Sequence, residues 1–227
     1  MIQNIQQYLT TIYALPQSID IRNFLIDSEA LLFYLNEKTL DSEISEKILF
    51  KFNQDGTIDV GLYFRKDILD RLDGIHPKEL LNESNFSSFC SLIEGVSHFL
   101  FLNFRSYHTL PLSALELEVQ AELDKFITSF IYQYHHHGQR KNPKCYADEI
   151  HSRLFQQYHL RTRLGEEEKN RYEFASQSAA KLCYQIKNYF LDYRPNWKGL
   201  LSYLRQFYRH GWNAKHFAIH SAVNFKQ

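Results

Sequence analysis

The stretch from about residue 85 to residue 104 is apolar on nearly every side when it is drawn as a helix. Its apolar residues are Phe89, Leu92, Ile93, Val96, Phe99, Leu100, Phe101, Leu102 and Phe104. A surface helix keeps a polar face toward water, so a helix without one has to be surrounded by other elements. We therefore expect this segment at the centre of a helical bundle.

Helical periodicity continues through most of the remaining sequence. Pro111 lies at the start of a second long helix, expected from Leu112 to about His136. Within the first 36 residues we expect two helices, separated by a break at Pro16, with the second running from Ile21 through Leu35. Residues 138–144 are the most linker-like, and further helices are expected at about 65–72, 145–158, 166–192, 196–209 and 213–223.

Residues 48–64 alternate apolar and polar side chains on either side of Asp55-Gly56, which is typical of a β-hairpin. A three-residue loop at residues 54–56 would pair Phe52 with Ile58 and keep the apolar side chains on one face. Gly56 would then take the left-handed conformation. A lone hairpin is only marginally stable in water, so we expect its apolar face to pack on helices or to join further strands.

Together these patterns predict an α+β fold that is predominantly α-helical, a helical bundle with an N-terminal β-hairpin. We divide it into a helix-hairpin subdomain at residues 1–75 and a helical bundle at residues 76–227, within one continuous fold. A chain of 227 residues with 8 Gly and 5 Pro is neither disordered nor fibrous, and it can bury a core of its own.

Cysteine usage and the N-terminus indicate a cytosolic protein without a membrane segment. Cys90, Cys145 and Cys183 are widely spaced and lack metal-ligand spacing, as expected of reduced thiols. The first residues lack the basic and apolar regions of a secretory signal, and the longest apolar run is far shorter than a membrane span. No glycine-rich phosphate loop and no Gly-x-Ser-x-Gly motif is present, so the sequence names no cofactor.

Charge is distributed unevenly although the formal net charge is zero. Residues 1–124 hold 9 Lys and Arg against 19 Asp and Glu, and residues 125–227 hold 17 against 7. One interpretation is a basic, tyrosine-rich surface for nucleic acid or another partner. The other is that the acidic and basic halves face each other within one fold or across a dimer. For the first interpretation, the candidate binding residues are Arg194, Lys198, Arg205, Arg209 and Lys215.

Polar residues of the 85–104 helix and of the helix after it form the candidate chemical site. Glu94 and His98 lie in one stripe, and Glu118 and Glu122 lie at the edge of the apolar face of the next helix. Two antiparallel helices could bring these four side chains together as catalytic candidates. Glu94, His98 and Glu122 are the candidate metal ligands. The alternative is a set of structural ion pairs that includes Arg105 or Lys125.

Three functions fit these observations. The first is a cytosolic, non-enzymatic interaction or regulatory protein, able to form a homo-oligomer, that binds a macromolecular partner through a charge-polarised, aromatic-rich surface. The second is a nucleic-acid-associated factor that uses the basic C-terminal half. The third is a small helical, metal-assisted enzyme centred on the Glu and His residues. The sequence leaves open whether the protein is an enzyme.

Overall fold

A computed structural model describes residues 1–16, 19–75, 79, 81–137, 142–156, 165–192 and 194–221 of the chain. It confirms a predominantly α-helical α+β fold. The elements in chain order are α1 (Ile2–Tyr13), the 3₁₀ helix η1 (Ile21–Phe24), β1 (Leu25–Ile26), α2 (Ser28–Leu35), β2 (Glu46–Phe52), β3 (Ile58–Phe64), α3 (Lys66–Leu72), α4 (Glu83–Tyr107), α5 (Ala114–His137), α6 (Pro143–Phe155), α7 (Glu166–Phe190), α8 (Trp197–Arg209) and α9 (Trp212–His220).

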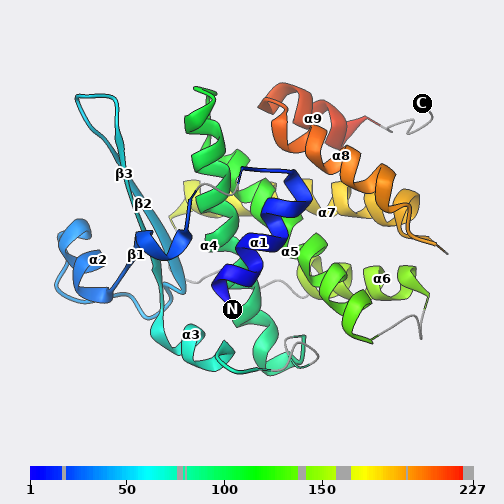
Figure 1. Cartoon of the computed structure of the whole chain (residues 1–227), viewed down its shortest axis with the longest axis horizontal. Helices are drawn as coiled ribbons and strands as arrows, with labels where there is room; N and C mark the ends of the chain where they lie inside the picture. The colour runs from blue at the N-terminus through cyan, green and yellow to red at the C-terminus, as the bar shows by residue number, and fades with distance from the viewer. Residues whose placement is uncertain are drawn as a thin grey trace.

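Helices α4 and α5 form the middle of the fold. The sheet, α2 and α3 lie at one end of the molecule and α6, α8 and α9 at the other, and the long helix α7 runs alongside α5 between them (Figure 1). Helix α1 packs on α4, α5 and α8. The expected burial of the 85–104 helix is confirmed, since Phe89, Val96 and Phe101 are fully buried. Helix α5 is buried on all sides from residue 118 to residue 133, polar residues included. Polar side chains of α5 are therefore buried together with the apolar side chains of the core.

The hairpin has the expected register. Phe52 pairs with Ile58, Phe50 with Val60 and Ile48 with Leu62. The Asn53 amide donates to the Thr57 carbonyl at 2.9 Å, which closes the three-residue loop. Gly56 has a φ of 82°, a conformation that side chains other than glycine rarely adopt. Strand β1 pairs in parallel with β3, so within the described residues the hairpin joins a three-stranded sheet in the order β1-β3-β2.

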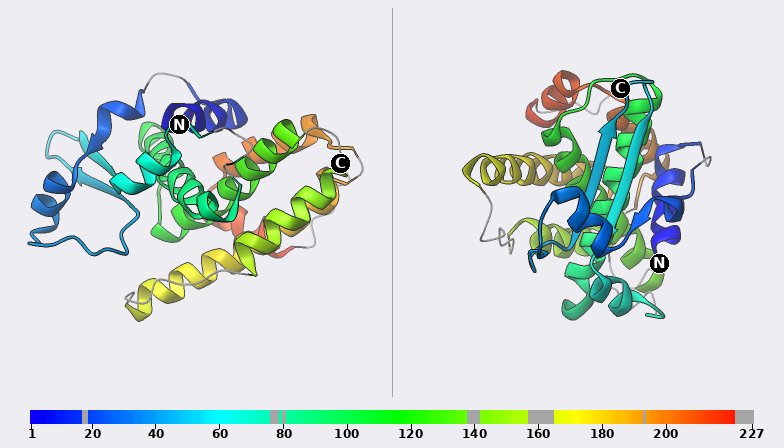
Figure 2. Two further views of the ribbon diagram at one scale, coloured as in Figure 1. Left: turned by 90° about the horizontal axis from the view of Figure 1, so that it is seen from below. Right: turned by 90° about the vertical axis from the view of Figure 1, so that its left-hand side faces the viewer.

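One face of the sheet packs closely on α4 (Figure 2). Gly95 makes this approach possible, because a Cβ atom there would lie 2.5 Å from Cε1 of Phe64. Leu62 and Phe64 are buried at this contact. The contact also places Glu46, the first residue of β2, against α4.

Three expectations about element boundaries were wrong. The second N-terminal helix does not run through residues 21–35 but is split into η1, β1 and α2, because Leu25 and Ile26 pair with β3 and Asp27 caps α2 by accepting from the Ala30 amide at 2.9 Å. Pro111 lies ahead of α5 rather than in its first turn. Pro143 opens α6, which shortens the expected linker at 138–144, and residues 138–141 lie outside the described part of the chain.

No helix within the described residues is both long enough and apolar enough to cross a membrane.

Candidate active site

Glu94, His98, Glu118 and Glu122 lie together between α4 and α5. The Nε2 atom of His98 is 3.6 Å from Oε2 of Glu118. The Nζ atom of Lys125 is 2.8 Å from Oε2 of Glu94 and 2.8 Å from Oε1 of Glu122. Lys125, not Arg105, is therefore the cation paired with these carboxylates, whereas Arg105 pairs with Glu116 at 3.2 Å.

Helical spacing explains this convergence. Glu94 and His98 are four residues apart on α4, and Glu118, Glu122 and Lys125 are three or four residues apart on α5, so each set lies on one face of its helix. The two helices pack along each other and are joined by residues 108–113, which turns these faces toward each other.

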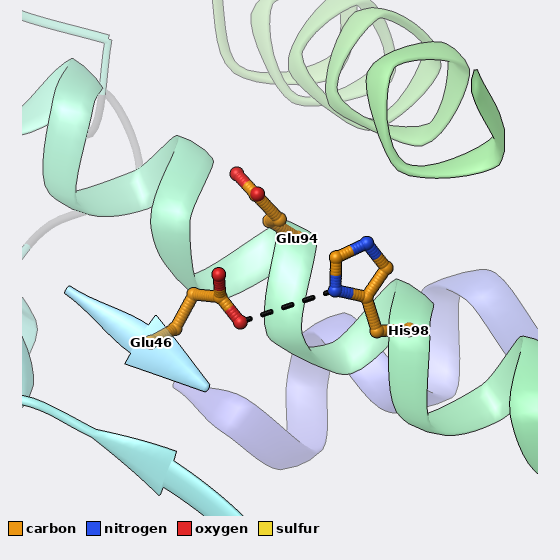
Figure 3. A group of neighbouring side chains, drawn as sticks. All are labelled: Glu46, Glu94 and His98. Atoms are coloured by element: carbon orange, nitrogen blue, oxygen red, sulfur yellow. Dashed lines mark ion pairs between the residues drawn. The ribbon is translucent and has the colours of Figure 1, made fainter. Parts of the chain in front are cut away.

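Glu46 is a member of the site that sequence reasoning missed. It is the first residue of β2, it is 5% exposed, and its Oε2 atom lies 3.9 Å from Nδ1 of His98 (Figure 3). One signal could have found it: with a period of two, Glu46 falls on the same strand face as the apolar Ile48 and Phe50. A carboxylate on such a face needs a buried partner. We call Glu46, Glu94, His98, Glu118, Glu122 and Lys125 the carboxylate cluster.

Neighbouring charges set the protonation of the carboxylate cluster. Burial by itself lowers the pKa of His98, but the carboxylates of Glu118, Glu46 and Glu94 outweigh it and raise this pKa to about 9. His98 is therefore protonated at neutral pH in the metal-free protein. Burial raises the pKa of Glu122, and the carboxylates of Glu122 and Glu94 overcome burial to raise the pKa of Lys125.

The carboxylate cluster opens onto a cleft of about 1290 Å³. Glu94, Glu122 and Lys125 line it together with residues that flank β2 and β3 and with residues of α4, α6 and α7. Other lining residues are Glu43, Ser45, Arg65, Leu81, Asn82, Glu83, Ser84, Phe86, Ser87, Cys90, Ser91, Glu149, Arg153, Leu154 and Tyr172. Burial raises the pKa of the Cys90 thiol to about 12, so this cysteine is not a thiolate nucleophile at neutral pH.

A second buried polar network, also missed from the sequence, is centred on Asp124. Asp124 accepts hydrogen bonds from Ser97 at 2.6 Å, from Gln120 at 3.0 Å and from the Tyr13 hydroxyl. Burial raises the pKa of Asp124 to about 6 despite these donors. Asp124 is not among the cleft-lining residues, and its partners tie α1, α4 and α5 together.

Of the five basic residues expected on a binding surface, three are used inside the fold. Arg205 donates to the Ile12 carbonyl at 2.9 Å and Arg209 to the Tyr13 carbonyl at 3.0 Å, so both satisfy the C-terminal end of α1. Lys215 is 1% exposed and lies 3.4 Å from Glu116, so its placement on a surface was wrong. Arg194 and Lys198 are exposed.

Ion pairs between the two halves of the sequence favour the second interpretation of the charge asymmetry. Lys125 and Lys215, from the basic half, pair with Glu94 and Glu116, from the acidic half. The opposite charges therefore meet inside one chain at these buried positions.

Lys215→Met is expected to remove a pH dependence of stability. Burial lowers the pKa of Lys215 from 10.5 to about 8, against the attraction of Glu116. Between these values the unfolded chain holds a proton that the folded chain has lost, so wild-type stability rises with pH by up to about 3 kcal/mol through this group. Urea denaturation of both proteins at pH 7 and at pH 10 measures the effect. The free energy of unfolding of the variant minus that of wild type should be higher at pH 7 than at pH 10. An equal difference at both pH values would contradict the expectation.

Comparisons of this chain with protein-family models, with curated proteins and with solved structures found no match.

Proposed function

We propose that this protein is a small helical enzyme that acts on a small polar molecule bound in the cleft. The observation that supports the proposal is the opening of two buried ionisable groups, Glu122 and Lys125, and of the half-buried Glu94 onto that cleft. Concave sites with a few convergent polar groups are typical of ligand-binding and active sites. The cleft is large enough for a small molecule, since such sites commonly have volumes of about 300–1,000 Å³.

The residues around the carboxylate cluster suit a polar substrate. Ser45, Ser87 and Ser91 line the same cleft as Glu94, and a serine hydroxyl can both donate and accept a hydrogen bond with a bound molecule. Among the lining residues, the ammonium of Lys125 and the carboxylate of Glu122 are 2.8 Å apart. A donor and an acceptor at this spacing can give a proton to a reacting group and take one back. We assign Glu122 the role of proton acceptor.

Glu122→Gln tests this assignment. Gln keeps an oxygen that accepts from Lys125 but cannot take up a proton, so we expect conversion to fall by about 100-fold or more. The measurement incubates the pure protein with a mixture of small polar metabolites and follows their disappearance, and the appearance of products, by mass spectrometry. Wild-type protein should convert at least one compound.

The matched control is Asp124→Asn, a change at a buried carboxylate on the same helix that does not line the cleft. Asn resembles the protonated Asp124, so the variant should fold and should convert the same compound as wild type. Circular dichroism verifies that both variants are folded. The proposal is contradicted if wild type converts nothing, or if Glu122→Gln retains wild-type conversion.

The expected macromolecular or nucleic-acid partner stays a prediction. Phe33, Tyr107 and Phe217 are strongly exposed and would suit a protein contact. A cytosolic location belongs to the present proposal, and it is supported by the free thiols of Cys90, Cys145 and Cys183.

A further inference from the structure

Three members of the carboxylate cluster have the composition of a metal centre. Glu46, Glu94 and His98 each place one donor atom so that all three atoms lie within 4.8 Å of one another. Figure 3 shows the Glu46 carboxylate directed at the imidazole from the strand, while Glu94 and His98 project from successive turns of α4. We infer that Glu46, Glu94 and His98 bind one divalent transition-metal ion of the Zn²⁺ or Mn²⁺ type.

The donor set fits such an ion. One imidazole nitrogen and two carboxylate oxygens suit Zn²⁺ and Mn²⁺, and three protein ligands with an open position are the pattern of a catalytic rather than a structural zinc site. Bond lengths of about 2.1 Å place ligand atoms roughly 3.4 Å apart around a tetrahedral ion. The separations found here, up to 4.8 Å, therefore need to close by up to about 1.4 Å, which rotation of the Glu side chains can supply.

A second observation concerns the other side of the imidazole. His98 is 6% exposed, and its Nε2 atom has no hydrogen bond within the described residues although Glu118 Oε2 lies 3.6 Å away. A histidine that binds a metal through one ring nitrogen usually donates from the other to a carboxylate. Glu118 occupies that position, so Nδ1 is left to face Glu46 and the proposed ion.

Charge balance agrees with a bound dication. The carboxylates of Glu118, Glu46 and Glu94 all act on His98, and the ammonium of Lys125 pairs with Glu94 and Glu122. The cluster therefore has more carboxylates than cationic side chains, and a divalent cation bound to Glu46 and Glu94 would add positive charge where the negative charge is in excess. Glu94 has two oxygens, so one can hold Lys125 while the other binds the ion.

This inference rests on the proposed function, for which the ion would be the cofactor beside the proton acceptor Glu122. It is tested by isothermal titration calorimetry of the full chain, stripped with EDTA, against Zn²⁺ and Mn²⁺. We expect one strong site per chain. Glu46→Gln and His98→Ala should each weaken it by about 100-fold or more, and Glu118→Gln by about 10–100-fold.

Matched controls separate this site from adventitious histidine sites. His151→Ala changes a half-buried histidine whose Nε2 bonds to the Ala180 carbonyl at 2.9 Å, and the double variant His216→Ala, His220→Ala removes an exposed pair whose rings are 4.3 Å apart. Both proteins should keep the strong site. The inference is overturned if wild type has no such site, or if Glu46→Gln and His98→Ala bind as tightly as wild type.

Two further readouts keep the inference testable. If the ligand variants fail to fold, Co²⁺ is added to wild-type protein and its visible spectrum is measured. Intense bands of a four- or five-coordinate ion would support the site. The weak spectrum of the hydrated ion would overturn it. Conversion that persists in EDTA without metal binding would overturn the metal site and leave the enzyme proposal standing. Metal binding without conversion of any compound would support the metal site and contradict the enzyme proposal.

Discussion

Arg105→Ala is expected to lower the free energy of unfolding by about 3–5 kcal/mol, because it removes the partner of a buried charge. Arg105 is 1% exposed, lies 3.2 Å from Oε1 of Glu116, and donates to the carbonyls of Pro111 at 3.0 Å and His210 at 3.2 Å. Alanine would leave these acceptors buried, with Lys215 as the remaining cation beside Glu116. Urea denaturation at pH 7, followed by circular dichroism, measures the loss.

Arg22→Ala is the matched control for Arg105. It breaks an arginine–carboxylate pair of similar kind, to Asp20 at 2.6 Å, but the Arg22 side chain is 58% exposed. Exposed pairs contribute little, so its effect should stay within about 1 kcal/mol. Equal losses for the two variants would show that burial of the Arg105 network does not determine its contribution.

Lys125→Met is also expected to cost about 3–5 kcal/mol at pH 7, since it leaves Glu94 and Glu122 facing each other without the cation between them. Methionine is apolar and similar in length, so loss of the charge outweighs loss of volume. Without the cation, the carboxylates hold protons more tightly in the folded chain than in the unfolded chain. The cost should therefore be smaller at pH 5 than at pH 8. Urea denaturation at both values measures it.

Adding Glu122→Gln to Lys125→Met is the control for this interpretation. The second change removes one of the two uncompensated carboxylates, so the double variant should be more stable than Lys125→Met by about 1–3 kcal/mol. A double variant no more stable than Lys125→Met would contradict an electrostatic origin of the loss.

The carboxylate cluster is difficult to explain by stability alone. Apolar residues of similar volume are often as stabilising as a buried ion pair or more so, because transfer of charges out of water is expensive. A core rich in Phe, Leu and Ile surrounds α4 and α5, so an apolar floor was structurally available. Glu94, Glu122 and Lys125 lie at a cleft, where the proposed enzyme would use them, whereas ion pairs deeper in the core could not reach a substrate.

The sequence alone determined the features that depend on residues a few positions apart. The pairing of Phe52 with Ile58 follows from a period of two and a loop that needs Gly56 in the left-handed conformation. The stripe that holds Glu94 and His98 follows from the helical period. These features depend on residues a few positions apart, so one sequence carries enough information to place them.

Tertiary packing determined which of these side chains contact each other. Glu46 reaches His98 only because the sheet docks on Gly95 of α4, a contact between segments about fifty residues apart. Lys215, which resembles an exposed lysine in the sequence, is buried because α9 places it over the Phe101 ring of α4 and beside Glu116 of α5. Arg105 likewise binds Glu116 rather than Glu94, since the crossing of two helices sets which side chains are neighbours. The local period fixes the face of a helix, and long-range packing alone fixes what that face contacts.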